Sequence, residues 1–195
     1  HMQGGSRIFR ALAAIEDANA VLDRALRVTT VRHPVSRALS AFDYLCLSND
    51  LQHSWFVDDR YRMNAVLGFD WESDPRTPRG FELFLNYVIW CRDTLCWNDA
   101  HWRPQIDNIC PALFRPDIIG RVEDLSAFYT AVAERLSKPL PKDYAPPPAN
   151  SQGKRSDRAA LLTPANLALI ETIYAADFEW LGYDPKQDRK STRLN

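Results

Sequence analysis

A short β-branched segment that stops abruptly and passes into a helix is the feature that most constrains the fold of this chain. Residues 27–32 read Arg-Val-Thr-Thr-Val-Arg, a composition that favours a buried strand, and His33-Pro34 ends it. Pro34 suits the first turn of a helix, because an amide there has no helical partner, and residues 35–47 continue with apolar residues at helical spacing. The chain therefore contains a strand, a tight turn and a helix.

The rest of the chain indicates further helices and a second strand. Apolar spacing predicts helices over residues 8–26 with a break near Asn19, over residues 80–91, over residues 125–136 after the capping residue Asp124, and from Thr163-Pro164 to about Gly182. Residues 117–123 read Asp-Ile-Ile-Gly-Arg-Val-Glu and predict a strand. Residues 48–80 are polar, aromatic and irregular, so we expect a mobile or substrate-facing insertion. These elements together indicate an α/β domain.

The composition is that of an ordinary globular protein. Its 195 residues include 46% apolar and 25% charged residues, which favours one domain over residues 1–185 with a flexible tail at residues 186–195. A formal net charge of −1 excludes binding of nucleic acid through bulk charge, so an anion has to bind locally. No stretch reaches the roughly 18 to 20 consecutive apolar residues that span a bilayer, so we expect no membrane segment, and a cytoplasmic location if the source is bacterial.

The turn after the first strand has the elements of a phosphate pocket. A strand that ends in Arg32 supplies positive charge, and the next helix directs N–H groups and the positive end of its dipole toward that arginine. Ser40 lies two turns into the helix and can add a neutral donor, and Arg37 can add a second charge or hold the strand end in place. The alternative is that Arg32 and Arg37 form ion pairs with acidic neighbours such as Asp43.

Three motifs follow one another along the chain. They are Val31-Arg-His-Pro-Val-Ser-Arg-Ala-Leu-Ser-Ala-Phe42, then Asp99-Ala-His-Trp-Arg-Pro-Gln105 leading to residues 117–125, and last Tyr174-Ala-Ala-Asp-Phe178 with Gly182-Tyr183. The first resembles the sulfotransferase motif in which a strand-end Arg and a Ser eight residues later, here Arg32 and Ser40, hold the 3′-phosphate of 3′-phosphoadenosine-5′-phosphosulfate (PAPS). The other two resemble the middle and the closing segment of carbohydrate-type sulfotransferases, which include chondroitin sulfotransferase-like and bacterial members.

The resemblance implies a P-loop-kinase-like fold with a parallel sheet and PAPS as the donor substrate, with no metal. The reaction implied is in-line transfer of a sulfuryl group to a hydroxyl of a carbohydrate-like acceptor. Relatives also hold the 5′-phosphosulfate with a strand and a Lys/Gly/Ser/Thr-rich loop, tens of residues before the first motif. Here the first lysine is Lys138, and Gly4-Gly5-Ser6-Arg7 is only a faint counterpart of that loop.

We therefore expect an N-terminally shortened, helix-rich member that lacks a central strand and the phosphosulfate loop, with activity reduced or lost. The alternative, from another class, is a non-catalytic binding or assembly module on the same scaffold. A sheet edge left uncovered by a missing strand would favour pairing with another chain, so a homo-oligomer is possible.

His101 is the candidate catalytic base, because imidazole titrates near neutrality and the residue lies in the second motif. The alternative is a structural histidine that is hydrogen-bonded under Trp102. His33 is expected to cap the helix that follows it rather than to abstract a proton.

Two further groups of polar residues have open roles. Lys154 and Arg155 lie where sulfotransferases bring a basic loop back over the nucleotide, so they contact the 3′-phosphate or adenosine, or they form a solvated turn. In the insertion, His53 and the neighbours Asp58 and Asp59 either contact the acceptor or belong to a solvated loop.

The cysteines do not indicate a metal. Cys91, Cys96 and Cys110 with His101 offer four ligand types, but their spacing is irregular for a zinc site, so buried thiols or a single disulfide are favoured. Cys96 and Cys110 would pair only in an oxidising compartment.

Overall fold

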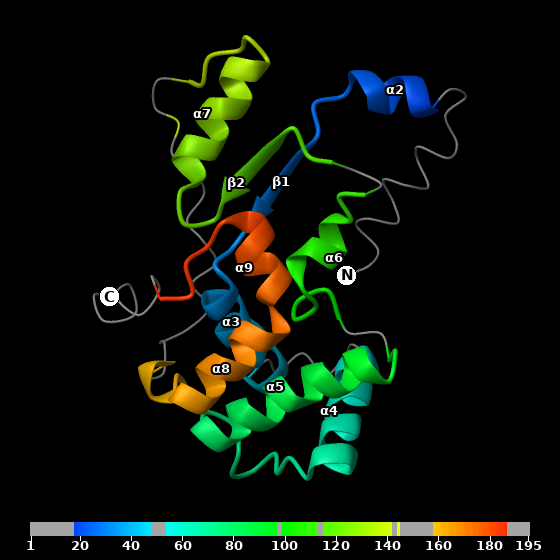
Figure 1. Ribbon diagram of the computed structural model, residues 1–195, viewed down its shortest axis with the longest axis vertical. Helices are drawn as coiled ribbons and strands as arrows, with labels where there is room; N and C mark the ends of the chain where they lie inside the picture. The colour runs from blue at the N-terminus through cyan, green and yellow to red at the C-terminus, as the bar shows by residue number, and fades with distance from the viewer. Residues whose placement is uncertain are drawn as a thin grey trace. The chain divides into compact units, whose positions relative to one another are not determined.

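The computed structural model contains helices and two parallel strands (Figure 1). The structure describes residues 18–47, 54–96, 99–112, 115–141, 144 and 158–186. In chain order the elements are α2 (Ala18–Arg24), β1 (Val28–Val31), α3 (Pro34–Leu47), α4 (Ser54–Leu67), α5 (Pro78–Asp93), α6 (Gln105–Ile109), β2 (Ile118–Arg121), α7 (Leu125–Arg135), the 3-10 helix η1 (Arg158–Leu161), α8 (Pro164–Ile173) and α9 (Ala175–Leu181). They divide between two compact units, named here the sheet unit (residues 1–31 and 107–146) and the helical unit (residues 32–106 and 147–195). Among the helices of the described residues, none has the length and apolar character needed to cross a membrane.

The sheet unit is built on β1 and β2, which pair in parallel with Val28 opposite Ile118. Both strands are rich in β-branched residues, which fit the pleated backbone. Just before the strands, the Asp117 carboxylate accepts hydrogen bonds from the backbone N–H of Arg27 at 2.8 Å and from its guanidinium at 3.0 Å. The expected helix-rich α/β architecture with a parallel sheet is confirmed for the part of the chain that the structure describes.

Helix α7 packs against β2 in the sheet unit (Figure 1). The predicted cap is confirmed, because the Asp124 side chain accepts the backbone N–H of Ala127 at 3.0 Å. The close approach requires a residue without a side chain in the strand, since a Cβ at Gly120 would lie 2.4 Å from the ring of Phe128. Of the helix predicted over residues 8–26, only α2 falls among the described residues, and Asn19 lies within it.

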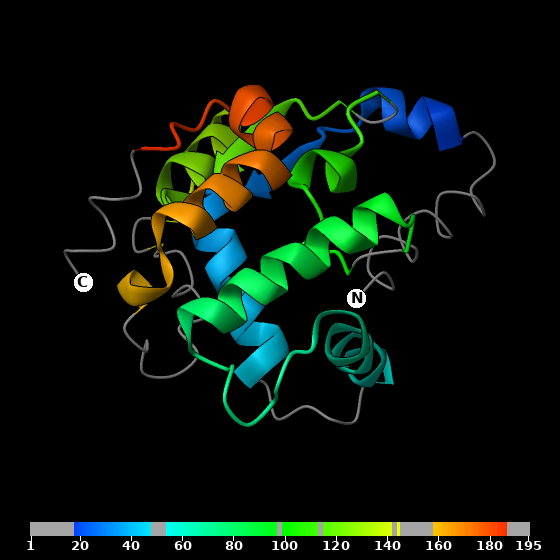
Figure 2. The same cartoon turned by 60° about the horizontal axis from the view of Figure 1, so that its bottom comes forward.

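The helical unit has an aromatic core. Figure 2 shows α5 running alongside α8, with which it makes its main helix contacts. The largest fully buried side chains here are Trp102, Tyr87, Tyr174, Phe42, Phe69, Phe81, Phe84, Leu39, Leu45, Met63 and Leu85. The Phe42 ring lies 5.2 Å and 5.6 Å, between centroids, from Phe81 and Phe84. Aromatic burial of this kind dominates the stability of a core.

The expectation of an irregular insertion over residues 48–80 is wrong for much of its length. Residues 54–67 form α4, and Asp59 and Met63, one turn apart, are the positions that it buries within its described side chains. Because few of the described positions of α4 are buried, its sequence shows little of the apolar periodicity that predicts a helix. Helix α5 also begins earlier than predicted, at Pro78, because the Thr77 hydroxyl caps it by accepting the N–H of Gly80.

The single C-terminal helix predicted from Thr163-Pro164 to Gly182 is two helices. Thr163 caps α8 through the N–H of Asn166, as predicted, and Gly182 ends α9 in the left-handed conformation with φ 64°. The break falls at Tyr174, which is fully buried and whose hydroxyl donates a hydrogen bond to the carbonyl of Trp102 at 2.8 Å. A contact far away in sequence therefore sets the helix boundary.

Candidate active site

His33 caps α3, as the sequence predicted. Its Nδ1 accepts the backbone N–H of Val35 at 3.3 Å, so the hydrogen lies on Nε2, which donates to the carbonyl of Asp184 at 3.1 Å. The rings of Phe178 and Tyr183 meet the imidazole edge-on, with centroids 5.7 Å and 5.1 Å away. The prediction that the helix start offers unpaired N–H groups is therefore wrong at Val35, whose amide bonds His33.

Arg32 follows directly after β1 and is half-buried. Its backbone N–H donates to Gln105 Oε1 and its carbonyl accepts from Gln105 Nε2, both at 2.8 Å. With the residues that the structure describes, its guanidinium makes no hydrogen bond or ion pair. The predicted alternative of a pairing with Asp43 is wrong, because that carboxylate is paired with Arg158.

Ser40 lies on the same side of α3 as Arg37 and Tyr44. At 3.6 residues per turn the three positions fall within a sector of about 60°. Arg37 donates to the carbonyls of Ala100 at 2.6 Å and Arg103 at 2.5 Å. Burial lowers the pKa of Arg37, and the neighbouring charge of Arg32 lowers it further. This side of α3 therefore faces residues 99–106, which we name the Trp102 loop.

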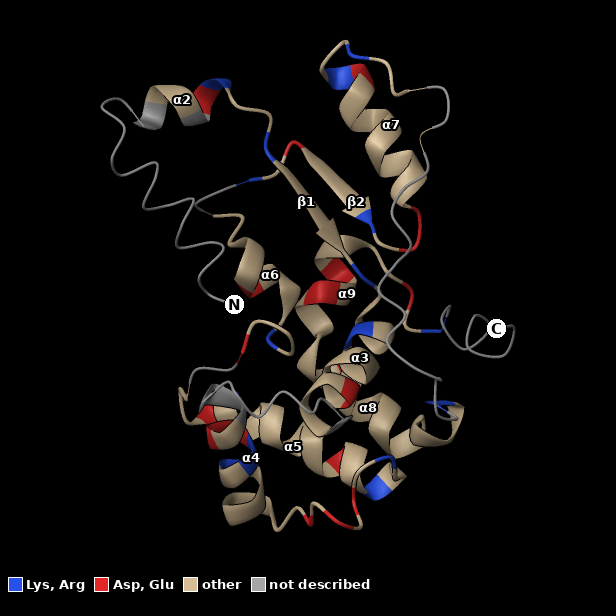
Figure 3. Cartoon of the chain, turned by 180° about the vertical axis from the view of Figure 1, so that it is seen from behind, with Lys and Arg blue, Asp and Glu red and all other residues tan. Residues whose placement is uncertain are grey.

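The Trp102 loop is fixed from several directions. Trp102 is fully buried and meets the ring of Phe84 edge-on. Besides Arg37 and Tyr174, the loop is held by Asp177, whose carboxylate accepts the backbone N–H groups of Gln105 and Ile106, each at 2.8 Å. Figure 3 shows acidic positions on α9, the helix that carries Asp177. A loop held at so many points can present its remaining side chains rigidly.

His101 is one of the partly exposed residues of this loop, at 35% side-chain exposure. Its Nδ1 and its backbone N–H both bond Oδ1 of Asp99, and its ring stacks on Tyr44 with centroids 4.2 Å apart. Burial acts to raise the pKa of Asp99, but the hydrogen bonds from His101 outweigh it and the pKa is lowered. The imidazole is thus oriented by a carboxylate and an aromatic ring. A histidine that is hydrogen-bonded to Asp99 fits both interpretations from the sequence, the catalytic base and the structural histidine.

Comparison with known proteins identifies the family. The model of the sulfotransferase family matches residues 8–184. The chain belongs to the sulfotransferase family. Comparisons with curated proteins and with solved structures found no significant match.

The parts of the three motifs that lie in the helical unit of this sulfotransferase meet at one place. The first supplies Arg32 and Ser40, the second supplies the Trp102 loop, and the third supplies Tyr174 and Asp177, which hold that loop. Arg32 is bonded to the Trp102 loop, His101 belongs to that loop, and Ser40 lies on the side of α3 that faces it. These parts of the three motifs, which are separate in the sequence, therefore contact one another in the folded chain.

Several polar residues that hold the Trp102 loop and its neighbours were given no role by the sequence. Asp99, Gln105 and Asp177 stand inside the quoted motifs, but their partners are not apparent from spacing. For Tyr44 a signal existed, because it lies four residues after Ser40 and so on the same helix face. Asp59 was expected in a loop or at the acceptor, whereas it is buried in α4.

Other predicted positions give a mixed result. Lys154, Arg155, His53 and the phosphosulfate-loop counterpart at residues 4–7 lie outside the described residues. Each of the four cysteines is a free thiol. Over the residues that the structure describes, no group of three or more His, Cys, Asp or Glu side chains is arranged to hold a metal ion.

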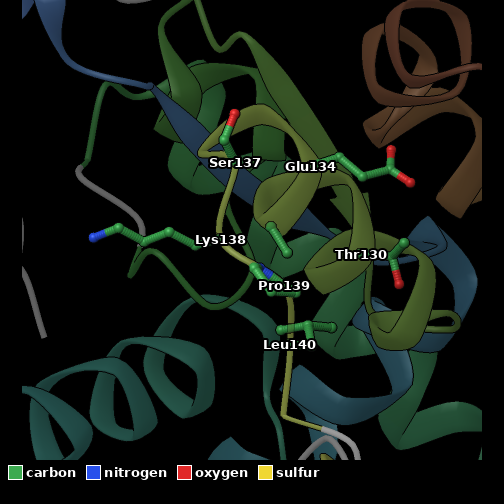
Figure 4. A pocket seen from close by; sticks show the side chains of 7 residues that line it. Thr130, Glu134, Ser137, Lys138, Pro139 and Leu140 are labelled. Atoms are coloured by element: carbon green, nitrogen blue, oxygen red, sulfur yellow. The ribbon is translucent and has the colours of Figure 1, made fainter.

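The sheet unit contains a cavity of about 440 Å³ at the end of α7. Ala133, Pro139 and Leu140 line it together with the polar residues Thr130, Glu134, Ser137 and Lys138. Figure 4 labels each of these except Ala133. In Figure 4 the side chains of Glu134 and Lys138 extend to opposite sides and do not converge. None of the predicted site residues lines this cavity, so the candidate site of the sulfotransferase is the one around the Trp102 loop.

Proposed function

We propose that this sulfotransferase binds PAPS on a P-loop-kinase-like fold and transfers its sulfuryl group to a hydroxyl of a carbohydrate-like acceptor. Arg32 and Ser40 bind the 3′-phosphate of the donor. Arg37 positions the Trp102 loop beside them, and Lys154 and Arg155 contact the nucleotide from the segment before η1.

The observation that carries the proposal is that the Arg32 guanidinium has no anionic partner among the described residues. Arg32 is half-buried as a residue, and a ligand that supplies negative charge would stabilise its guanidinium. Asp43, the ion-pair partner that the sequence suggested for Arg32, is paired with Arg158 instead. Ser40 makes no side-chain hydrogen bond within the described part of the chain, so its hydroxyl is available to the same anion. A phosphate group supplies several acceptor oxygens, which matches a forked cation beside a neutral donor.

His101 acts as the base. The acceptor oxygen forms a bond to sulfur while the bond from sulfur to the 5′-phosphate oxygen breaks, and the acceptor proton passes to the imidazole. Asp99 holds the ring through Nδ1 and stabilises the imidazolium that forms, as a carboxylate does beside other histidine bases. The acceptor is contacted by residues 48–80, where Tyr61 on α4 exposes 72% of its surface for stacking on a sugar ring.

Calorimetry with 3′-phosphoadenosine-5′-phosphate, the desulfated donor, tests the proposal. We expect weak binding by the wild-type chain, because its sequence holds only a faint counterpart of the phosphosulfate loop. This binding should be weakened further, roughly 10- to 100-fold in Arg32→Ala and roughly 2- to 10-fold in Ser40→Ala, the usual contributions of charged and neutral hydrogen bonds. Arg79→Ala is the matched control, because Arg79 is an exposed arginine of the same unit that pairs with Asp74. Equal affinity in Arg32→Ala and wild type would refute the proposal.

Sulfuryl transfer decides between the two classes of function. Nucleotide binding with transfer to an oligosaccharide acceptor supports the enzyme. Nucleotide binding that depends on Arg32, without transfer to any of a panel of hydroxylated acceptors, supports a binding or assembly module on a sulfotransferase scaffold.

A further inference from the structure

We infer that Gln105 and Asp177 are positioning residues for Arg32: the Gln105 side chain, held by Asp177, clamps the backbone of Arg32 and fixes the point from which its guanidinium reaches an anion. The inference rests on the proposed function, because Arg32 is the anion-binding residue of that proposal.

The clamp uses both polar atoms of the Gln105 side chain. Oε1 accepts the N–H of Arg32, and Nε2 donates to the carbonyl of the same residue, each at 2.8 Å. This is the pair of hydrogen bonds that a neighbouring strand would make, supplied here by one amide group. With both backbone groups fixed, the guanidinium is left with only the torsions of its own side chain.

Asp177 determines which way the Gln105 amide faces. Its Oδ2 lies 3.4 Å from Gln105 Nε2 and accepts the backbone N–H of Gln105 at 2.8 Å. If the Gln105 amide were turned the other way, its oxygen would face the Asp177 carboxylate and the Arg32 carbonyl. All three groups are acceptors, so no hydrogen bond could form between them. The carboxylate, which is fully buried, thus selects the orientation that binds Arg32.

The same geometry explains why glutamine rather than glutamate occupies position 105. A glutamate of the same length would bring a second negative charge to the buried Asp177 and would present only acceptors to the Arg32 carbonyl. Gln105→Glu therefore opens the clamp with almost no change of volume. Asp177→Asn weakens it from the other end, because a neutral amide replaces the carboxylate that accepts the two loop amides.

The test measures anion binding without a nucleotide. Inorganic phosphate is titrated into the ¹⁵N-labelled full chain, and the dissociation constant is read from the backbone resonances of Arg32 and Ser40. We expect Gln105→Glu and Asp177→Asn each to weaken phosphate binding about tenfold, which corresponds to about 1.4 kcal/mol. In the Arg32→Ala background, Gln105→Glu should cause no further loss, because the clamp acts through Arg32.

Asp74→Asn is the matched control. Asp74 is also a buried carboxylate of the helical unit that accepts a backbone N–H, that of Asp70 at 2.8 Å, and the described partners of its side chain, Asp70 and Arg79, lie outside the Trp102 loop. It should lower thermal stability and leave phosphate affinity unchanged. A merely structural role for Gln105 and Asp177 predicts the same result as this control, and that result would overturn the inference.

Hydrogen exchange of the wild-type chain covers the case in which the variants do not fold. The amides of Arg32 and Ile106 should be protected, because Gln105 and Asp177 accept them. Exchange at the rate of an unstructured peptide would refute the clamp without any substitution. Phosphate binding that depends on Arg32 and Gln105, together with no binding of 3′-phosphoadenosine-5′-phosphate, would instead refute the proposed donor and leave the clamp standing.

Discussion

Tyr87 and Asp59 form a buried pair in which the Tyr87 hydroxyl donates a hydrogen bond of 2.5 Å to Asp59 Oδ1. The pair joins α5 to α4, and Figure 3 marks the acidic positions of α4. Burial raises the pKa of Asp59 to about 6, although the Tyr87 hydrogen bond and the Arg62 charge act to lower it. Burial, and the neighbouring Asp59, raise the pKa of Tyr87 as well. In the folded chain Asp59 is therefore mainly the neutral acid only below about pH 6.

This pair predicts that the Asp59→Asn variant has a flatter dependence of stability on pH. In the wild type, the folded state keeps a proton on Asp59 between about pH 4 and pH 6 that the unfolded state releases, so the free energy of unfolding falls as the pH rises through this window. Asparagine still accepts the Tyr87 hydrogen bond and has no charge to bury. The quantity to compare is the free energy of unfolding of Asp59→Asn minus that of wild type. We expect this difference to rise by up to about 3 kcal/mol between pH 4 and pH 7.

Urea unfolding at a series of pH values measures this difference. Asp58→Asn is the matched control, since Asp58 is the adjacent residue of α4 and is exposed. It should follow the wild-type curve. A difference between Asp59→Asn and wild type that does not change from pH 4 to pH 7 would show that folding does not raise the pKa of Asp59.

In the sheet unit, Gly120→Ala should destabilise the packing of α7 on β2. The added Cβ would lie 2.4 Å from the Phe128 ring, so the ring or the helix has to move. Overpacking of this kind costs about 1–3 kcal/mol in the free energy of unfolding, measured by urea denaturation. Phe128→Leu should relieve part of that cost, so the double variant should lose less than the sum of the two single losses. Strict additivity would contradict the contact.

The sequence predicted those elements whose determinants are local. The strand at residues 27–32, the His33-Pro34 turn and the Thr163-Pro164 helix start depend on neighbouring residues. The Thr77-Pro78 start carries the same signal, although the predicted helix begins at residue 80. Two features depend on contacts that are distant in sequence. The burial of α4 on one narrow side depends on packing, and the helix break at Tyr174 depends on a hydrogen bond to Trp102.

The candidate site divides in the same way. Arg32, Ser40 and His101 were found because motif spacing names them. Their partners were not assigned, because Gln105 and Asp177 are 72 residues apart and become neighbours only in the folded chain. A motif shows which residues belong together but not which atoms meet.

The pairing of His101 with Asp99 predicts a change that is independent of catalysis. His101→Ala removes the side-chain hydrogen bond that lowers the pKa of Asp99, while the burial that raises it remains. The Asp99 pKa should therefore rise, as followed by ¹³C NMR of the carboxyl group. His101→Asn, which places an amide N–H close to the position of Nδ1, should restore part of the lowering. An unchanged Asp99 pKa in both variants would contradict the pairing, and with it the proposed orientation of the base.

The ion pair at the entry to the sheet predicts an opposite pH dependence from that of Asp59. The guanidinium and the backbone N–H of Arg27 hold the pKa of Asp117 at about 2, below its ordinary value of 3.8. This contribution to stability is present above about pH 4 and is lost as the pH falls toward 2, because the folded carboxylate then takes up its proton. Asp117→Asn should therefore be less stable than wild type at pH 6, and the two should converge near pH 2.

Salt separates the two parts of this interaction. Both side chains are about one third exposed, at 35% and 32%, so 1 M NaCl screens their charges. The bond from the Arg27 backbone N–H to Asp117 has fixed geometry just before the strands, so part of the difference between Asp117→Asn and wild type should persist. Asp23→Asn is the control, because Asp23 acts on Arg27 through its charge and should have no effect in 1 M NaCl. If the Asp117→Asn difference also vanishes in salt, Asp117 contributes only surface charge and does not hold the backbone of Arg27 at the start of β1.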